Sequence, residues 1–194
     1  MLKFLKRRPT EANSDESLML RYQQGDTVAF ETLYRRHKDP LYAYLYRSHV
    51  DLAVIEEVAQ ETWMAVINAA QRYRASAKFR TYLFAIAHRK LVDFWRKHKL
   101  DKLLDRVDEK GELIVEKVPA PGKLHTDAID LSMDLLLALE ALSKEQQQAF
   151  LLKEEGFTRR EIAVMTGSNE ETIKSRIRYA TGHLKRMLEV QYAE

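Results

Sequence analysis

The sequence has no cysteine, and this absence removes several classes of function at once. A disulfide framework and a cysteine zinc site are both excluded, and so is cysteine redox chemistry. Glycine and proline are also scarce, at six and four residues among 194. No run approaches the roughly 18 consecutive apolar residues that a membrane-spanning helix requires, and no apolar stretch follows the basic start from Met1 to Arg8. We therefore expect a cytoplasmic protein without a membrane span.

Signals of catalysis are lacking as well. The glycines form neither a phosphate-binding loop nor a dinucleotide fingerprint. The histidines do not have the spacing of metal ligands, and they are His37, His49, His88, His98, His125 and His183. We therefore predict that the protein is not an enzyme, and that it has no metal, no cofactor and no small-molecule substrate.

The composition is that of a soluble globular protein, with 45% apolar and 31% charged residues. The formal net charge is only +3, so the total charge does not by itself indicate a nucleic-acid partner. Apolar residues recur every three to four positions, and no segment shows the alternation of a strand. The predicted fold class is all-α, with two small helical domains joined by a linker.

Glycine, proline and charge divide the chain into four segments. Residues 1–13 are predicted to form a flexible basic tail, and residues 14–99 a first helical domain. From 100 to 134 the helical periodicity fades, and nine Asp or Glu residues face five Lys or Arg residues. This composition predicts an acidic and loosely structured linker. Residues 135–194 resume the helical spacing and form the second predicted domain.

Short polar residues indicate where the helices of the first domain begin. Ser14 or Asp15 is expected to cap a first helix, Asp26 a second and Asp51 a third. Such side chains accept hydrogen bonds from the N–H groups that a helix start leaves without partners. Pro40 predicts a break or a kink in the second helix, because proline has no N–H group to donate.

The second domain contains the sequence pattern of a helix-turn-helix. Capping boxes, in which a hydroxyl residue is followed three positions later by Glu or Gln, predict helix starts at Ser143, Thr158 and Ser168. A tight turn is expected at Gly167, where a helix end requires a residue without Cβ. The helices predicted from these signals span 144–155, 159–166 and 170–188.

The last of these helices has an apolar side and a cationic side. Ile173, Ile177 and Leu184 are spaced to pack against the preceding short helix. The other side is expected to present groups suited to phosphates and base edges, namely Lys174, Ser175, Arg176, Arg178 and Tyr179. The alternative is a helical hairpin with a solvated charged face, and the negative charges of Glu170 and Glu171 would repel phosphates.

The densest basic and aromatic segment lies between Arg72 and Lys102, largely within a helix expected over roughly 78–99. Ten Lys or Arg residues face two Asp residues there, a net charge of +8. Single-stranded nucleic acid is bound by this combination, because cations follow its backbone while rings stack on unpaired bases. The alternative is that the rings belong to the core. The rings expected to be exposed are those of Tyr73, Tyr82 and Trp95.

The preceding helix is acidic, which suggests a different partner. Its carboxylates and one amide lie on or near one face, at Asp51, Glu56, Glu57, Gln60 and Glu61. The alternative interpretation is a solvated charged face without a partner.

Four stretches together resemble the extracytoplasmic-function sigma factors of bacterial RNA polymerase. They are GDTVAFETLYRRHKDPLYAYLYR from Gly25, IEEVAQETWMAVI from Ile55, FRTYLFAIAHRKLVDFWRK from Phe79, and LSKEQQQAFLLKEEGFTRREIAVMTGSNEETIKSRIRYA from Leu142. The resemblance covers nearly all of the chain except the tail and the linker. The order and spacing of the four motifs are more specific than any one of them.

The resemblance implies a sigma factor that binds core RNA polymerase, recognises the minus-thirty-five and minus-ten elements of promoter DNA, assists strand opening, and is restrained by an anti-sigma factor. It assigns to the polymerase the acidic set Asp51, Glu56, Glu57, Gln60 and Glu61. It assigns to the melted strand Tyr73, Arg80, Tyr82, His88, Arg89, Trp95 and Arg96. It assigns to the duplex Thr172, Lys174, Ser175, Arg176, Arg178 and Tyr179.

Two residues depart from the pattern of such proteins, which often have Asn at the position of Arg89 and Arg at the position of Tyr179. Both positions belong to the sets expected to contact DNA, so the resemblance leaves the promoter sequence open. A conventional helix-turn-helix regulator, in which the first domain would sense a signal or dimerise, is the other functional hypothesis.

Overall fold

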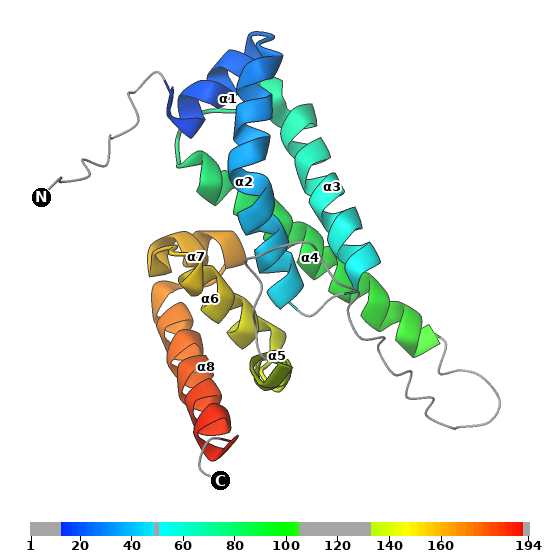
Figure 1. Ribbon diagram of the computed structural model, residues 1–194, viewed down its shortest axis with the longest axis vertical. Helices are drawn as coiled ribbons and strands as arrows, with labels where there is room; N and C mark the ends of the chain where they lie inside the picture. Colours follow the sequence, from blue (N-terminus) through cyan, green and yellow to red (C-terminus); the bar gives the residue numbers. More distant parts are fainter. Residues whose placement is uncertain (1–12, 49–50, 105–132, 192–194) are drawn as a thin grey trace, which may run out of the picture.

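The computed structural model describes residues 13–48, 51–104 and 133–191, and the regular structure of this part is helical (Figure 1). The helices are α1 (Asp15–Gln23), α2 (Thr27–Arg47), α3 (Leu52–Ala69), a 3₁₀ helix (Ala70–Arg72), α4 (Phe79–Leu104), α5 (Met133–Glu140), α6 (Lys144–Glu154), α7 (Arg159–Thr166) and α8 (Glu170–Gln191). The all-α prediction is confirmed for the described part of the chain.

Capping side chains set most helix starts where the sequence predicts them. Ser14, Asp26 and Asp51 each accept a hydrogen bond from a backbone amide of the first turn, at 2.8 to 3.1 Å. Ser143 and Thr158 form complete capping boxes with the residues three positions later. These five predicted caps are confirmed, with Ser14 rather than its neighbour capping α1.

A break or a kink is predicted at Pro40, and the break does not occur, because α2 continues through this residue to Arg47. The kink stays a prediction. Proline removes one helix hydrogen bond and costs about 3 kcal/mol in a helix interior. Leu33 and Leu41, which are both fully buried, anchor α2 to the core on either side of the proline. Their packing outweighs the local cost, so the helix persists.

The cap predicted at Ser168 is also wrong. The side-chain oxygen of Asn169 accepts a hydrogen bond from the backbone N–H of Thr172 at 2.8 Å, so Asn169 caps α8. The hydroxyl of Ser168 instead accepts a hydrogen bond from Arg176 at 2.9 Å. Asn and Ser are both favoured at this position, and the path of the turn decides between them.

The helices form two groups. α2, α3 and α4 pack together with α1 across one end, while α8 packs on α5, α6 and α7 (Figure 1). The core of the first group comes from α2, α3 and α4, with Leu33, Leu41, Leu45, Ile55, Val66, Leu83 and Leu91 almost fully buried. The core of the second group includes Leu139, Leu152, Ile162, Ile173, Ala180 and Leu184.

The predicted linker is partly helical at its two ends. α4 continues to Leu104 and α5 begins at Met133, so residues 100–104 and 133–134 are not loosely structured. Residues 105–132 and 1–12 lie outside the described residues. The acidic loose linker and the flexible basic tail therefore stay predictions.

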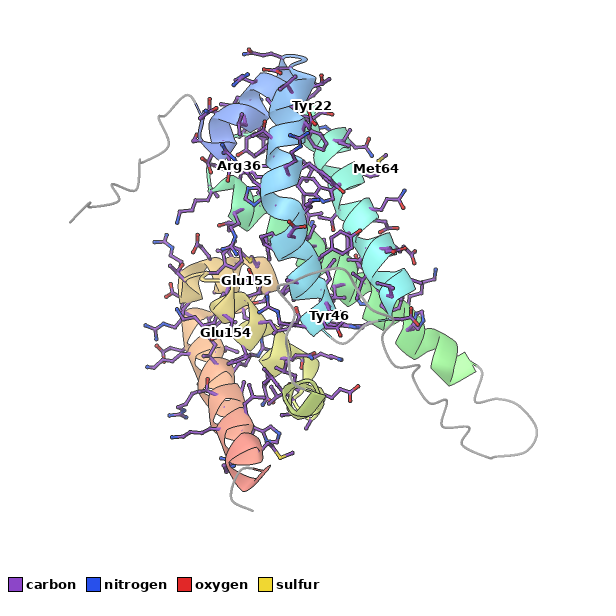
Figure 2. All side chains as sticks on the ribbon, viewed as in Figure 1. Tyr22, Arg36, Tyr46, Met64, Glu154 and Glu155 are labelled. Carbon is purple, nitrogen blue, oxygen red and sulfur yellow. The ribbon has the colours of Figure 1, made fainter. Side chains whose placement is uncertain are left out.

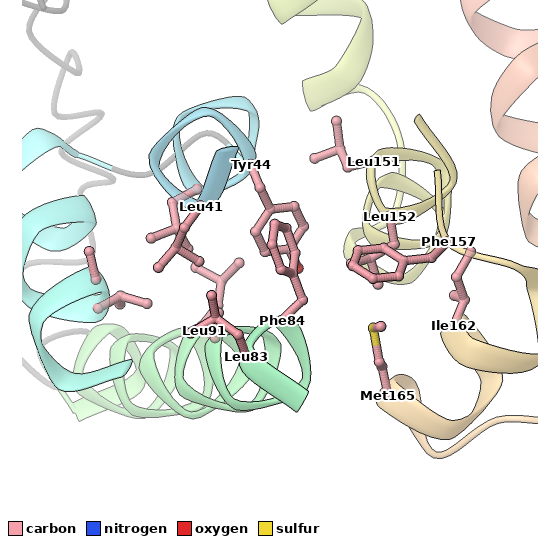
Figure 3. Packing of buried hydrophobic residues seen from close by; sticks show 14 of the residues in the cluster. Leu41, Tyr44, Leu83, Phe84, Leu91, Leu151, Leu152, Phe157, Ile162 and Met165 are labelled. Atoms are coloured by element: carbon pink, nitrogen blue, oxygen red, sulfur yellow. The ribbon is translucent and has the colours of Figure 1, made fainter. Parts of the chain in front are cut away.

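The two groups touch along one side. α7 contacts α4, and α6 contacts α2. Tyr44 and Phe84 of the first group face Phe157 of the second (Figure 3), and the ring centroids of the two phenylalanines are 5.0 Å apart. α8 extends away from the first group (Figure 1), so this contact leaves the long helix of the helix-turn-helix uncovered.

Candidate nucleic-acid interface

The turn between α7 and α8 is held by backbone and side-chain contacts. Gly167 ends α7 with a φ of 64°, a left-handed conformation that residues with a Cβ adopt at a cost. Asn169 then caps α8, and the bond from Arg176 to Ser168 ties the second turn of α8 back to the loop. This short segment therefore helps to set the position of α8 relative to α7.

α8 has the two faces that the sequence predicts. Ile173, Ala180 and Leu184 are buried, and Ile162 and Met165 of α7 are buried with them. Four residues of the opposite face are exposed, namely Lys174, Ser175, Arg178 and Tyr179. The apolar and cationic sides of the predicted helix are therefore confirmed as faces, whereas their contact with DNA stays a prediction.

Two members of the predicted duplex-contacting set are less accessible than the others. Thr172 and Arg176 are half-buried, and Arg176 uses one N–H group on Ser168. Lys174 also has a partner, since its ammonium lies 3.2 Å from the carboxylate of Glu171. Both groups of this pair are exposed, so the pair is weak and leaves the lysine available to a phosphate.

The start of α4 is fixed by a residue of α1. The backbone N–H of Phe79 donates to the carboxylate of Glu16 at 2.7 Å, so a side chain distant in sequence serves as the cap. The side chain of Gln23 donates to the carbonyl oxygens of Ala70 and Gln71 at 2.9 and 3.0 Å, which ties α1 to the 3₁₀ helix before α4. The basic and aromatic helix thus starts from a rigid end.

The ring of Tyr73 is buried, so the prediction that it is exposed is wrong. Only 4% of this residue is accessible, and its ring packs edge-on against Tyr82 at a centroid distance of 5.3 Å. Burial, together with the nearby carboxylate of Glu16, raises the pKa of Tyr73 to about 12. The residue follows the 3₁₀ helix and turns inward beneath the first turns of α4, which the local sequence does not reveal.

The other members of the predicted strand-binding set differ in exposure. Arg89 and Arg96 are exposed, whereas Tyr82 and Trp95 are half-buried. The rings of Tyr82 and Trp95 are therefore less exposed than the sequence predicts. The ammonium of Lys144 lies 5.2 Å from the centroid of the Trp95 ring, which places a cation of the second group over an aromatic face of the first.

His88 is almost fully buried, at 8% exposure. Its Nδ1 lies 3.4 Å from the hydroxyl of Tyr44. Burial lowers the pKa of His88, and a hydrogen bond with Gln148 opposes this effect without cancelling it. The neutral form of the imidazole is therefore favoured where the two groups of helices meet.

The acidic face of α3 is open. Glu56, Glu57, Gln60 and Glu61 are exposed, and the carboxylate of Glu61 lies 2.9 Å from the ammonium of Lys90. Asp51, the fifth member of the set, caps the helix and is exposed. A hollow of about 380 Å³ adjoins this face, lined by Tyr34, Tyr42, Glu56, Ala59, Gln60, Trp63 and Met64.

Comparisons with known proteins identify the two groups of helices. The family model "Sigma-70 region 2" matches residues 33–100, and "Sigma-70, region 4" matches residues 132–184. The ECF RNA polymerase sigma factor SigL of Mycobacterium tuberculosis is 25% identical over 170 residues, which cover 85% of this chain and 92% of that protein. This chain belongs to the extracytoplasmic-function sigma factors.

A second relative agrees with this sigma-factor assignment, and a solved structure has a similar fold. The RNA polymerase sigma factor NccH of Alcaligenes xylosoxydans xylosoxydans is 26% identical over 183 residues, covering 93% of this chain and 97% of that protein. The fold is similar to that of the sigma factor RpoE in its complex with the anti-sigma factor NepR from Bartonella quintana, with a TM-score of 0.69 and 24% identity. That match covers 83% of this chain and 97% of RpoE.

In this sigma factor, region 2 lies within α2 to α4 and region 4 within α5 to α8. In the described ranges, no helix is both long enough and apolar enough to cross a membrane. No group of three or more acidic or histidine side chains in the same ranges is arranged to hold a metal ion.

The contact between region 2 and region 4 uses residues that sequence analysis missed. Gln147 and Gln148 are at most 1% exposed, and the amide of Gln148 donates to the hydroxyl of Ser48 at 3.0 Å. Glu155 forms ion pairs with region 2 as well. The sequence contains one signal for this contact. Two successive glutamines lie on the side of α6 that carries the apolar Leu151 and Leu152, and buried amides require hydrogen-bond partners from another element.

Proposed function

We propose that this sigma factor binds core RNA polymerase, directs it to promoters through minus-thirty-five and minus-ten elements, and assists the separation of the DNA strands. It acts in the cytoplasm as a binding subunit, not as a catalyst, and requires no cofactor, metal or small-molecule substrate. One observation carries the proposal: region 2 and region 4 occur in order, and region 4 presents the exposed cationic face of a capped helix-turn-helix.

Region 4 reads duplex DNA through α8 in this proposal. A helix-turn-helix inserts its second helix into the major groove, where cations contact phosphates and polar groups contact base edges. Lys174 and Arg178 supply exposed cations, and Tyr179 is 60% exposed beside them. Thr172 and Arg176 are half-buried, the side chain of Arg176 is bound to Ser168 in the turn, and Ser175 completes the surface.

Region 2 holds the separated strand along α4. Arg89 and Arg96 offer exposed cations, and Tyr82 and Trp95 offer half-buried rings on which an unpaired base can stack. Arg80 forms an ion pair with Glu155 of region 4 in this structure. Tyr73 and His88 are buried, so in this proposal they pack beneath the residues that contact the strand and do not contact it themselves.

The acidic face of α3 binds the polymerase. Glu56, Glu57, Gln60 and Glu61 are exposed on a helix whose start Asp51 caps, and a rigid helix with exposed carboxylates fits a basic surface of a large partner. An anti-sigma factor is a second protein partner. This part of the proposal is supported by the similar fold of RpoE, which was solved in complex with the anti-sigma factor NepR.

Gel filtration with core RNA polymerase tests the proposal. The full chain is expected to co-elute with the polymerase, and a Glu57→Ala/Gln60→Ala variant is expected to lose most of this association. Glu31→Ala, which removes an exposed carboxylate from α2, is the matched control and should co-elute like the wild type. A wild-type chain that binds duplex DNA but never co-elutes with polymerase would instead be a conventional helix-turn-helix regulator.

A further inference from the structure

One carboxylate of region 4 joins two arginines of region 2. Glu155 follows the last residue of α6, and its side chain is only 9% exposed (labelled in Figure 2). One oxygen accepts a hydrogen bond from Arg47 at 2.6 Å, and the other accepts one from Arg80 at 2.7 Å. Arg80 also donates to the backbone carbonyl of Glu155. The end of α6 therefore rests on cations from both α2 and α4.

Two aromatic rings hold one of these cations in place. The guanidinium carbon of Arg80 lies 5.0 Å from the ring centroid of Phe84 and 4.6 Å from that of Phe157. A guanidinium stacked on rings keeps its plane fixed, and its N–H groups then point in a defined direction. Because Phe84 belongs to region 2 and Phe157 to region 4, region 2 by itself keeps one of the two rings beside Arg80. The paired arginines thus form a site for an anion with two oxygens that region 2 preorganises in part.

Beside the rings of Tyr44, Phe84 and Phe157, the contact around this site contains polar groups that pair across the two regions. The hydroxyl of Tyr44 donates to Gln148, and Gln148 donates to Ser48. Thr81 donates to the carboxylate of Glu161 at 3.0 Å. Each such hydrogen bond makes only a modest net contribution to the free energy of the contact, because water replaces the protein partner when the contact opens, so a contact of this mixed kind can open reversibly.

The same contact covers part of the surface proposed for the separated strand. Arg80 is paired with Glu155, and the ring of Trp95 lies beneath Lys144. His88 lies next to the Tyr44 hydroxyl that donates to Gln148. Arg80 and Trp95 of α4 therefore contact region 4 directly, and His88 is joined to α6 through Tyr44. A DNA strand and region 4 cannot occupy Arg80 at the same time.

We propose that Arg47 and Arg80 form a binding site for a backbone phosphate of the separated promoter strand, and that Glu155 occupies this site while regions 2 and 4 are closed. The inference rests on the proposed function and adds Arg47 to the strand-binding surface. A carboxylate and a phosphodiester each present two anionic oxygens, which arginine recognises through paired N–H groups. Region 4 and the strand then compete, so strand binding opens the contact and the contact weakens strand binding.

Affinity for single-stranded DNA tests the competition. Glu155→Gln keeps the shape of the side chain and removes its charge, and it should increase the affinity of the full chain for a fluorescein-labelled oligothymidylate by about tenfold. Glu154→Gln makes the same change of charge at an exposed neighbour, so its affinity should equal that of the wild type. Equal affinities of the two variants would overturn the proposal.

The phosphate site itself is tested in the Glu155→Gln background. Adding Arg47→Gln should weaken binding and reduce the slope of log affinity against log salt by about 0.7, the change expected when one phosphate of a single strand is no longer neutralised. Adding Arg35→Gln, an exposed arginine of α2, should leave the slope unchanged. A slope that Arg47→Gln does not alter removes this residue from the site.

Domain opening can be followed in a protein that keeps Glu155, which covers the case in which the Gln variants fail to fold. Because the chain has no cysteine, dyes can be attached specifically to Asn68→Cys in α3 and Met187→Cys in α8, both exposed positions. Energy transfer between them should fall when oligothymidylate is added. Constant transfer at saturating DNA contradicts the competition.

Gel filtration with core polymerase distinguishes a failure of this phosphate-site proposal from a failure of the proposed sigma-factor function. If the wild type and both glutamine variants fail to co-elute, the sigma-factor function fails. If all three co-elute while Glu155→Gln and Glu154→Gln bind oligothymidylate equally, only the phosphate site fails.

Discussion

Glu16 of α1 accepts a hydrogen bond from the backbone N–H of Phe79 at 2.7 Å and thereby caps α4 from another helix. The two residues are 63 positions apart in the sequence. The carboxylate satisfies a backbone donor and places negative charge at the positive end of the helix dipole. One side chain thus joins α1 to the helix proposed to hold the separated strand.

Glu16→Ala is expected to lower the free energy of unfolding of region 2 by about 1 to 2 kcal/mol, because it leaves the first N–H groups of α4 without this cap. Urea unfolding followed by tryptophan fluorescence measures this effect, since Trp63 and Trp95, the two tryptophans of the chain, both lie in region 2. Glu31→Ala removes a carboxylate from an exposed pair and should cost less than about 0.5 kcal/mol. Equal losses in the two variants would show that the cap contributes nothing.

Asn169→Ala is expected to destabilise the first turn of α8 by about 1 kcal/mol, because the amide oxygen caps this helix. Hydrogen exchange of the amides of Thr172 and Ile173 should become faster, whereas Asn169→Ser, which keeps an acceptor, should exchange like the wild type. Ser168→Ala should have the smaller effect at these amides. Faster exchange in Ser168→Ala than in Asn169→Ala would restore Ser168 as the cap.

Lys174→Ala is expected to weaken binding of the full chain to duplex DNA and to reduce the slope of log affinity against log salt by about 0.9, the value for one phosphate contact. Arg176 is a less suitable probe, because its bond to Ser168 also holds the turn. Arg35→Ala removes one positive charge from α2 and should leave the slope unchanged. DNA titrations of the three proteins at several salt concentrations measure these slopes. An unaltered slope in Lys174→Ala would mean that this lysine does not contact a phosphate.

Asp15 makes the stability of region 2 depend on pH under acidic conditions. Burial acts to raise the pKa of this carboxyl, but hydrogen bonds with His37 and Arg36 outweigh burial and hold the pKa below its ordinary value of 3.8. The unfolded chain therefore takes up this proton first. The stabilisation is fully present above pH 3.8 and is lost as the pH falls through the lowered pKa.

Asp15→Asn should accordingly show a weaker decline of unfolding free energy below this pH than the wild type. Acid unfolding at fixed urea, followed by tryptophan fluorescence, measures the difference. Asp39→Asn is the control, because this exposed carboxylate lies 3.9 Å from Lys38 and should leave the wild-type decline in place. An unchanged decline in Asp15→Asn would mean that the Asp15 contacts do not stabilise the folded state.

The sequence by itself determined the local features of this protein. The caps at Asp26, Ser143 and Thr158, the left-handed turn at Gly167 and the two faces of α8 were all predicted and are all present. Each depends on residues within about one or two helical turns of one another, where hydrogen-bond geometry and apolar spacing act directly. The family pattern is similarly carried by motifs that are contiguous in the chain.

Tertiary structure alone decided which of the predicted contact residues are accessible, whether α2 continues past its proline, and which groups pair across the chain. Tyr73 is buried, Pro40 lies within a continuous helix, and Glu155 meets Arg47 across 108 positions. The physical reason is that helical periodicity assigns a residue to a face of its own helix but does not say which other element covers that face. Only the docking of region 4 on region 2 places a carboxylate between two arginines.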